Sequence, residues 1–222
     1  MHTYPLRLQD GHLFVTVDGQ DWLLDTGAPS SFGSVPSVTL GEQTFGLDSD
    51  YLGLSASTLT DHVGVPCVGL LGADVLGPFD HRFDLQMGTH TLSAAELTVA
   101  GESVALASFM GIPIVSLRCG DTTVRMFFDT GAQISYFQDE TRTIYPSAGA
   151  LQDFYPGVGQ FETTTHWVPM HLGSLPFTLR CGELPGLLGM TLLLAGTQGI
   201  VGNEILRDRV VGYFPRRGLL VL

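Results

Sequence analysis

One motif occurs twice in this chain of 222 residues and limits how the chain can fold. Residues 23–31 read LLDTGAPSS and residues 127–135 read FFDTGAQIS, so both segments place two large apolar side chains before Asp-Thr-Gly-Ala. The apolar pair indicates a buried strand, and Asp-Thr-Gly is a natural turn, because aspartate accepts hydrogen bonds from the following backbone and glycine adopts positive φ. A single such motif is usually only a turn. Two equivalent copies indicate an internal repeat.

The segments around the motif repeat as well. The strand-like residues 13–17 and 114–117 precede the two motifs, and each is followed by a turn and a second β-rich stretch that runs into the aspartate. Further along the chain, residues 70–76 (LLGADVL) and 200–206 (IVGNEIL) share the order apolar, apolar, glycine, any residue, polar, apolar, leucine. The order of hairpin, aspartate motif, variable middle and apolar-glycine motif therefore occurs twice.

The repeat predicts the domain organisation. We expect an N-terminal unit over residues 1–100 and a C-terminal unit over residues 101–222, each closed by a terminal strand, at 83–92 and 210–222. No linker rich in proline, glycine or serine separates the units, so we expect them to pack together. The middle segment is longer in the second copy, and its excess, which includes residues 163–181, reads as further strands.

Helical signals are weak. Short helical turns are expected only at residues 73–76, 91–99 and 203–207. Asp74 and Glu204 occupy the polar position of the two apolar-glycine motifs. We expect these two carboxylates to anchor loops rather than to act in catalysis.

The two motif aspartates, Asp25 and Asp129, are the candidate catalytic residues. A repeated unit with an acidic residue at the same place favours pairing about a pseudo-twofold axis, which would bring the two carboxyl groups together. Two carboxyl groups in contact cannot both ionise easily, so the pair holds one proton. One carboxylate can then act as a base on water while the protonated partner donates to a substrate carbonyl. This chemistry needs no metal and no cofactor, and we expect neither.

The chain resembles the aspartic proteases of the pepsin/retropepsin superfamily. The resemblance covers nearly the whole chain and rests on the two DTGA motifs and the two apolar-glycine motifs. It implies an all-β fold with two pseudo-twofold-related, β-barrel-like lobes and a central cleft. It also implies an endopeptidase that hydrolyses peptide bonds through a water molecule activated by Asp25 and Asp129. Its partners would be extended peptide or protein substrates, with apolar side chains favoured on both sides of the cut.

The resemblance assigns roles to the residues beside each aspartate. Thr26 and Thr130 match threonines that hydrogen-bond across the two lobes and lock the two loops. Gly27 and Gly131 match glycines whose backbone faces the substrate. The two apolar-glycine motifs match segments that pass behind each catalytic loop and support it.

The residue after each Asp-Thr-Gly departs from the pepsin-type pattern of serine or threonine. It is alanine in both copies, Ala28 and Ala132, as in retroviral-type enzymes, so the chain resembles a retroviral-type subunit that has been duplicated and fused. A hydroxyl at this position could hydrogen-bond the ionised carboxylate and stabilise it. Without that hydroxyl the pKa values of the pair should be higher, and we expect a weakly acidic pH optimum.

The family closes its cleft with a glycine-rich hairpin, the flap. In the second copy the candidate is residues 155–161, where glycines allow hinge motion and aromatic residues flank them. Its candidate substrate contacts are Tyr155, Gly157, Val158, Gly159 and Phe161. In the first copy only residues 51–54, with Tyr51, are comparable. We expect one flap, on the C-terminal unit, with an ordinary glycine-rich turn as the alternative at either place.

Composition excludes several classes of function. The net charge is −12, which argues against binding to nucleic acid or to an anionic membrane surface. No apolar run reaches the ~20 residues that span a bilayer. No signal peptide is visible, so a cytoplasmic location is favoured. The three cysteines, Cys67, Cys119 and Cys181, lack metal-binding spacing, and we expect them to be buried and unbridged. We also expect a monomer that is active without removal of a pro-segment.

Two other functions are considered. A peptide-binding module on the same fold, with a degenerate cleft, would explain the short middle segment of the first copy. A hydrolase of another class with paired carboxylates, such as a glycosidase, is also conceivable, although such enzymes lack a repeated DTGA motif. Peptide cleavage that is lost on Asp25→Asn or Asp129→Asn would favour the protease.

Overall fold

The computed structural model describes residues 1–155, 158–186 and 189–222. Strands account for 53% of the structure and helices for 14%, and most strands lie in two large sheets, so the all-β class is confirmed. The larger sheet has ten strands, in the spatial order β12 (Ser103–Ala105), β22 (Leu219–Val221), β21 (Val210–Phe214), β10 (Asp80–Asp84), β11 (Thr89–Ser93), β1 (His2–Gln9), β2 (His12–Val17), β3 (Gln20–Leu24), β9 (Gly69–Leu71) and β4 (Phe32–Gly33).

The second sheet has eight strands, all from residues 107–201. Their spatial order is β13 (Ala107–Phe109), β14 (Ile112–Cys119), β15 (Thr122–Phe128), β20 (Gly199–Val201), β16 (Ser135–Phe137), β19 (Leu175–Glu183), β18 (Gly159–Leu172) and β17 (Ser147–Tyr155). The strands β18 and β19 contain the excess residues 163–181, so the prediction of further strands there is confirmed.

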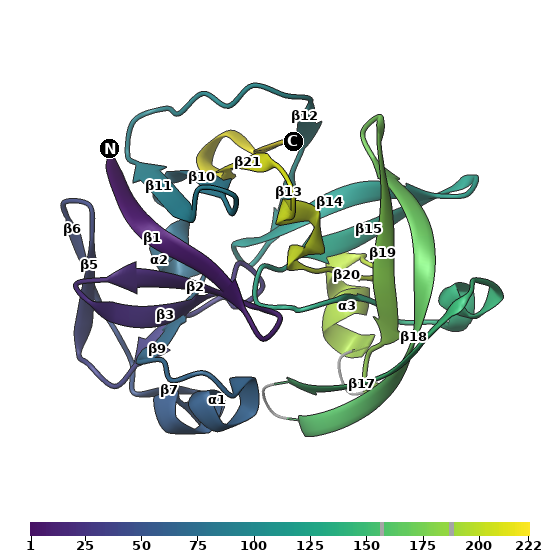
Figure 1. Cartoon of the computed structure of the whole chain (residues 1–222), viewed down its shortest axis with the longest axis horizontal. Helices are drawn as coiled ribbons and strands as arrows, with labels where there is room; N and C mark the ends of the chain where they lie inside the picture. The colour runs from purple at the N-terminus through teal and green to yellow at the C-terminus, as the bar shows by residue number, and fades with distance from the viewer. Residues whose placement is uncertain (156–157, 187–188) are drawn as a thin grey trace.

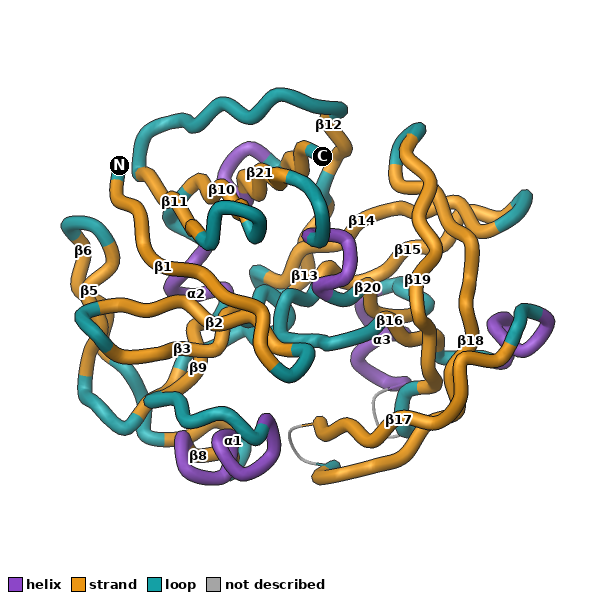
Figure 2. Tube along the Cα trace, viewed as in Figure 1, coloured by secondary structure: helices purple, strands orange, loops and turns teal. Residues whose placement is uncertain are grey.

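Small elements complete the chain. Two-stranded ribbons form from β5 (Ser37–Leu40) with β6 (Gln43–Gly46), and from β7 (Asp50–Tyr51) with β8 (Leu54–Ser55). Within the described residues the helical segments are α1 (Ala56–Val63), α2 (Ala73–Leu76), α3 (Gly189–Ala195) and the 3₁₀ turns η1 (Glu140–Ile144), η3 (Asn203–Leu206) and η4 (Pro215–Arg217). In Figures 1 and 2 the early strands with α1 lie on one side, and the strands of the eight-stranded sheet lie on the other.

The hairpins before the two aspartate motifs form because their turns suit the twist of the strands. Asp18 and Gly19 connect β2 to β3, and both have positive φ, 50° and 76°, as a type I′ turn requires. Gly120, at φ 58°, lies in the turn that connects β14 to β15. Both hairpins therefore deliver a buried strand directly to an aspartate.

Strands from both ends of the chain share the ten-stranded sheet. The strand β21 pairs antiparallel with β10, and β22 pairs with β12. The terminal segments 83–92 and 210–222 were each expected to form one strand, and this prediction is wrong, because each contains a turn between two strands. In the first segment the Asp84 carboxylate accepts a hydrogen bond from the backbone N of Met87 at 3.0 Å and closes that turn.

The helical predictions succeed in part. The segment 73–76 forms α2, and 203–206 forms the 3₁₀ turn η3. The segment 91–99 is not helical, because residues 89–93 pair as β11 with both β1 and β10. The helix α1 was missed, although Ser55 caps its N-terminus and the left-handed Gly64 ends it.

The apolar core runs through the whole molecule. The largest buried cluster includes residues of both halves, among them Trp22, Phe83, Phe128 and Tyr213. This continuity explains why no tether separates the halves. All three cysteines are free; Cys119 and Cys181 are buried as expected, whereas Cys67 is only partly buried.

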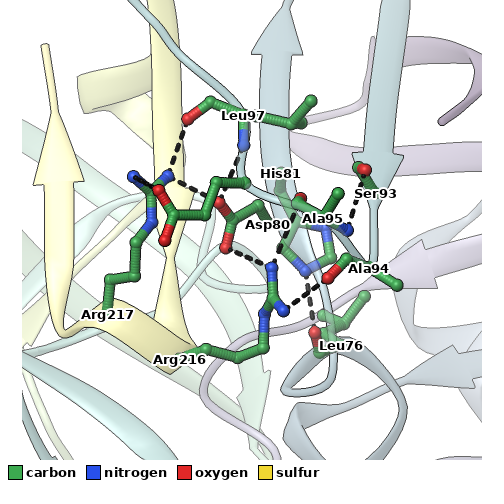
Figure 3. A network of polar contacts seen from close by, with 10 residues as sticks. Leu76, Asp80, His81, Ser93, Ala94, Ala95, Leu97, Arg216 and Arg217 are labelled. Carbon is green, nitrogen blue, oxygen red and sulfur yellow. Dashed lines mark hydrogen bonds and ion pairs between the residues drawn. The ribbon is translucent and has the colours of Figure 1, made fainter.

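A buried carboxylate fixes the C-terminal segment to this core. Figure 3 shows Asp80 of β10, which is fully buried, between Arg216 and Arg217. The guanidinium groups lie 3.0 Å and 2.5 Å from its two carboxylate oxygens, and the backbone N of Leu97 donates to it at 3.0 Å. A buried charge needs such pairing and hydrogen bonding to be tolerated. The contacts join β10, the segment after β11 and η4 into one unit.

Candidate active site

The two aspartates end equivalent strands. Asp25 follows β3, which pairs parallel with β9, and Asp129 follows β15, which pairs parallel with β20. The backbone N of Asp25 donates to the carbonyl of Leu71 at 3.0 Å, and that of Asp129 donates to the carbonyl of Val201 at 3.0 Å. The apolar-glycine segments therefore hold the two aspartates in matching positions.

Each aspartate is held by its own loop. The carboxylate Oδ1 of Asp25 accepts from the backbone N of Gly27 and of Ala28, both at 2.8 Å. In the second loop Oδ1 of Asp129 accepts from Gly131 at 2.8 Å and from Ala132 at 3.2 Å. One oxygen of each carboxyl group is thus fixed by the loop backbone, and the other is available for different contacts.

The two carboxyl groups meet across the loops. A Cβ atom at Gly27 would overlap the carboxyl group of Asp129, and one at Gly131 would overlap that of Asp25, so glycine permits the close approach. Each carboxyl group therefore lies against the glycine of the opposite loop, which brings Asp25 and Asp129 close together. Burial, followed by the charge of Asp129, raises the pKa of Asp25 well above its usual range. Burial also raises the pKa of Asp129.

Threonines lock the two loops reciprocally. The backbone N of Thr26 donates to Oγ1 of Thr130, and the backbone N of Thr130 donates to Oγ1 of Thr26, both at 3.0 Å. The hydroxyl of Thr26 donates to the carbonyl of Phe128 at 2.7 Å, and that of Thr130 donates to the carbonyl of Leu24 at 2.8 Å. Both threonines are buried, so four hydrogen bonds join the loops away from water.

The segments behind the loops support them with matching contacts. The backbone N of Ala73 donates to Ala28 O at 2.8 Å, and that of Asn203 donates to Ala132 O at 2.9 Å. Serines contribute as well: Ser31 Oγ accepts from Gly72 at 2.8 Å, and Ser135 Oγ accepts from Gly202 at 3.1 Å. Sequence reasoning missed both serines, although each is the sixth residue after its aspartate and could have been found from the repeat.

The two polar residues of the apolar-glycine motifs behave differently. Asp74 accepts from the backbone N of Ser31 at 3.0 Å and from its hydroxyl at 2.6 Å, so it anchors the first aspartate loop as expected. Glu204 accepts from the backbone N of Arg180 at 3.0 Å, so it holds strand β19 rather than a loop. Here the repeat is not symmetric.

A long hairpin crosses from the second half of the chain toward the first. Strands β17 and β18 form it, with Tyr155 opposite Gly159 at its end, and Val158 is 36% exposed in the turn. Gly157 lies outside the described residues. Phe154 stacks on His62 of α1, with ring centroids 4.8 Å apart. Figure 1 shows β17 facing α1 at the lower edge of the molecule.

The predicted flap residues do not all line the same cavity beside the two aspartates. Tyr155, Val158 and Tyr51 line a cavity of about 430 Å³ that also contains Asp25 and Asp129. Phe161 lines a second, smaller cavity instead. Gly159 lines neither the larger nor the smaller cavity. Burial, and then the charges of Asp129 and Asp25, raise the pKa of Tyr155, so its hydroxyl stays protonated. The hairpin and the small ribbon of Tyr51 therefore both reach the paired carboxyl groups.

The second cavity, of about 60 Å³, lies against the same carboxyl groups. Its wall includes three polar residues that sequence reasoning did not select: His12, Tyr136 and Asp153. No motif marks them, because they come together only through strand pairing. His12 Nδ1 lies 3.3 Å from the carbonyl of Gly131, and burial lowers the pKa of His12.

Among the described residues, no group of three or more histidine, cysteine, aspartate or glutamate side chains is arranged to hold a metal ion. In the same described ranges no helix is long and apolar enough to cross a membrane.

The chain matches no protein-family model, and no curated protein matches it significantly. The chemistry open to the site therefore follows from its geometry: a buried carboxyl pair that retains one proton can act as base and acid together.

Proposed function

We propose that the chain is an aspartic endopeptidase with the two-lobed architecture of the pepsin/retropepsin superfamily. The observation that carries the proposal is the close approach of the buried Asp25 and Asp129 carboxyl groups, held by reciprocal contacts of two equivalent loops. One lobe would correspond to the part of the ten-stranded sheet around β3 and β9, and the other lobe to the eight-stranded sheet. The rest of the ten-stranded sheet would join the two lobes, because it includes β12, β21 and β22 from the second half of the chain.

Hydrolysis would proceed by general acid–base catalysis. The ionised carboxylate takes a proton from a water molecule, whose oxygen attacks the carbonyl carbon of the substrate. The protonated partner donates its proton to the carbonyl oxygen, which yields a tetrahedral diol. The C–N bond then breaks as the protonated carboxyl group gives its proton to the leaving nitrogen and the ionised partner takes a proton from one hydroxyl of the diol, which becomes the product carboxyl group. The pair ends with one proton, as it began, so no cofactor is consumed.

Substrates would be extended peptide or protein segments. The cavity of about 430 Å³ lies within the size range of ligand-binding clefts and is lined mainly by apolar residues, among them Phe32, Leu70 and Ile112. The hairpin that ends at Tyr155 would act as the flap over the bound peptide. We propose further that the chain acts as a monomer, because both loops of the carboxyl pair come from one chain.

A cleavage assay tests the proposal. A diverse peptide mixture is incubated with the protein between pH 3 and pH 7, and products are identified by mass spectrometry. Cleavage should be lost in Asp25→Asn and in Asp129→Asn, because the pair then lacks its base or its shared proton. The matched controls are Asp18→Asn and Asp121→Asn, which alter exposed aspartates on the turns of the two preceding hairpins. No cleavage by the wild type would refute the protease and leave a peptide-binding module.

A further inference from the structure

The two cavities beside the carboxyl pair are built from equivalent residues of the repeat. The larger cavity is lined by Gly27, Ala28 and Phe32, and the smaller cavity by their counterparts Gly131, Ala132 and Tyr136. In a peptidase the cavities on the two sides of the carboxyl pair receive the side chains on the two sides of the cut. Differences between them therefore predict an asymmetric substrate preference.

The main difference is the exchange of Phe32 for Tyr136. Among the described residues that line the larger cavity, only Asp25 and Asp129 are charged. In the smaller cavity the hydroxyl of Tyr136 donates to Oδ2 of Asp153, which lies on β17. The other oxygen of Asp153 accepts from the backbone N of Phe154 at 2.8 Å. A carboxylate has about four acceptor positions, so Asp153 retains capacity for a further donor.

Within the described ranges this carboxylate has no ion-pair partner. None of the ion pairs among the described residues includes Asp153. The guanidinium group of Arg180 is already bonded to Thr165 Oγ1 and to the carbonyls of Ala148 and Ala150. His12 shares the cavity wall, but burial lowers its pKa and favours the neutral ring. The carboxylate of Asp153 therefore lines the cavity with two hydrogen-bond donors but with no ion-pair partner among the described residues.

We propose that the smaller cavity is a specificity subsite for a basic side chain, lysine in particular, next to the bond that is cut. This inference rests on the proposed peptidase function and replaces the expected apolar preference on one side of the cut. The cavity is narrow, about 60 Å³, which favours the thin, unbranched stem of lysine over a branched or aromatic side chain. Phe154, Phe161 and Leu184 line the cavity and would pack against the stem, while the ammonium group binds Asp153.

Two sets of matched peptides test the subsite. Each peptide carries phenylalanine on one side of the cut and lysine, norleucine or glutamate on the other, and each pair is made in both orders. At pH 6 the wild type should cleave the lysine peptide about tenfold more efficiently than the norleucine peptide in one of the two orders, because a charge-assisted hydrogen bond to a partly buried carboxylate is worth about that factor. The glutamate peptide should be the poorest substrate.

Variants assign the preference to Asp153. In Asp153→Asn the ratio of lysine to norleucine cleavage should fall about tenfold, since the amide carries no charge, although its single oxygen can accept from only one of the two donors, Tyr136 or the backbone N of Phe154. The control Glu162→Gln removes an exposed carboxylate on the same hairpin and should leave the ratio unchanged. Thermal unfolding of each variant confirms that it is folded. A ratio near one in the wild type, or an unchanged ratio in Asp153→Asn, overturns the subsite.

A binding assay separates this inference from the proposed function. Fluorescence anisotropy of labelled lysine and norleucine peptides is measured on Asp25→Asn and on the double variant with Asp153→Asn. If no peptide is cleaved but lysine is still preferred in binding through Asp153, the subsite stands and the peptidase fails. If peptides are cleaved but neither cleavage nor binding depends on Asp153, the peptidase stands and the subsite fails. If neither assay responds to lysine, the subsite is overturned in either case.

Discussion

The paired histidines of the ten-stranded sheet predict a specific loss of stability in acid. Leu76 O can only accept, so His81 Nε2 donates to it at 2.8 Å, and the neutral ring presents Nδ1 to His90 Nε2 at 2.9 Å. A second proton on His81 would place two donors face to face in a buried stack of aromatic rings. Burial is the main reason that the pKa of His81 is lowered from 6.5 to about 4.

The size of the effect follows from this pKa. A histidine whose pKa is lowered on folding binds more protons in the unfolded state, so its contribution is full above pH 6.5 and declines as the pH falls toward 4. The difference between 6.5 and about 4 corresponds to about 3 kcal/mol. The cost of His81→Phe, measured by urea unfolding, should therefore be about 3 kcal/mol smaller at pH 4 than at pH 7.5.

The comparison needs one fixed background. The pKa of Asp25 is raised on folding, so the aspartate pair titrates in the opposite sense and stabilises the fold as the pH falls. Both His81→Phe and its reference are therefore measured in Asp25→Asn. Stability curves of reference and variant that stay parallel between pH 7.5 and pH 4 would show that His81 keeps an ordinary pKa, and the reasoning from burial would be wrong.

Three further predictions concern the aspartate loops. Thr26→Val should lower the free energy of unfolding in urea by about 2–5 kcal/mol, because it leaves the buried backbone N of Thr130 and the carbonyl of Phe128 without partners. A decrease below about 1 kcal/mol would contradict the lock between the loops. Ala28→Ser should move the pH optimum of peptide cleavage to lower values, since the added hydroxyl would donate a hydrogen bond to the ionised carboxylate of Asp25 and stabilise it. An unchanged pH–rate profile would exclude that hydrogen bond. Gly27→Ala should abolish cleavage, because its Cβ would overlap the carboxyl group of Asp129; cleavage at the wild-type rate would show that the loops can move apart.

The sequence identified the centre of the site because the centre is local and repeated. Asp25, Thr26 and Gly27 occupy the same positions in both motifs as Asp129, Thr130 and Gly131, and the structure brings these six residues together. The supporting serines, Ser31 and Ser135, were readable from the same repeat and were overlooked. A site that depends on a short, duplicated segment can therefore be predicted from the sequence alone.

The rest of the site depends on pairing between distant strands, which the sequence pattern does not encode. Asp153 meets Tyr136 only because β17 folds over the second cavity, and neither residue lies in a motif. The placement of β21 beside β10 likewise joins residues more than a hundred positions apart. The helix α1 is a different case, because its cap at Ser55 is local and could have been recognised.

The position of β21 also determines when the chain can finish folding as a ribosome synthesises it. This strand lies between β22 and β10, so the hydrogen-bonding edge of β10 stays open until residues 210–214 emerge. Until then Asp80 has neither of its arginine partners. The nascent polypeptide therefore carries an unpaired strand edge while the residues between β10 and β21 are synthesised, and such an edge can pair with the wrong strand.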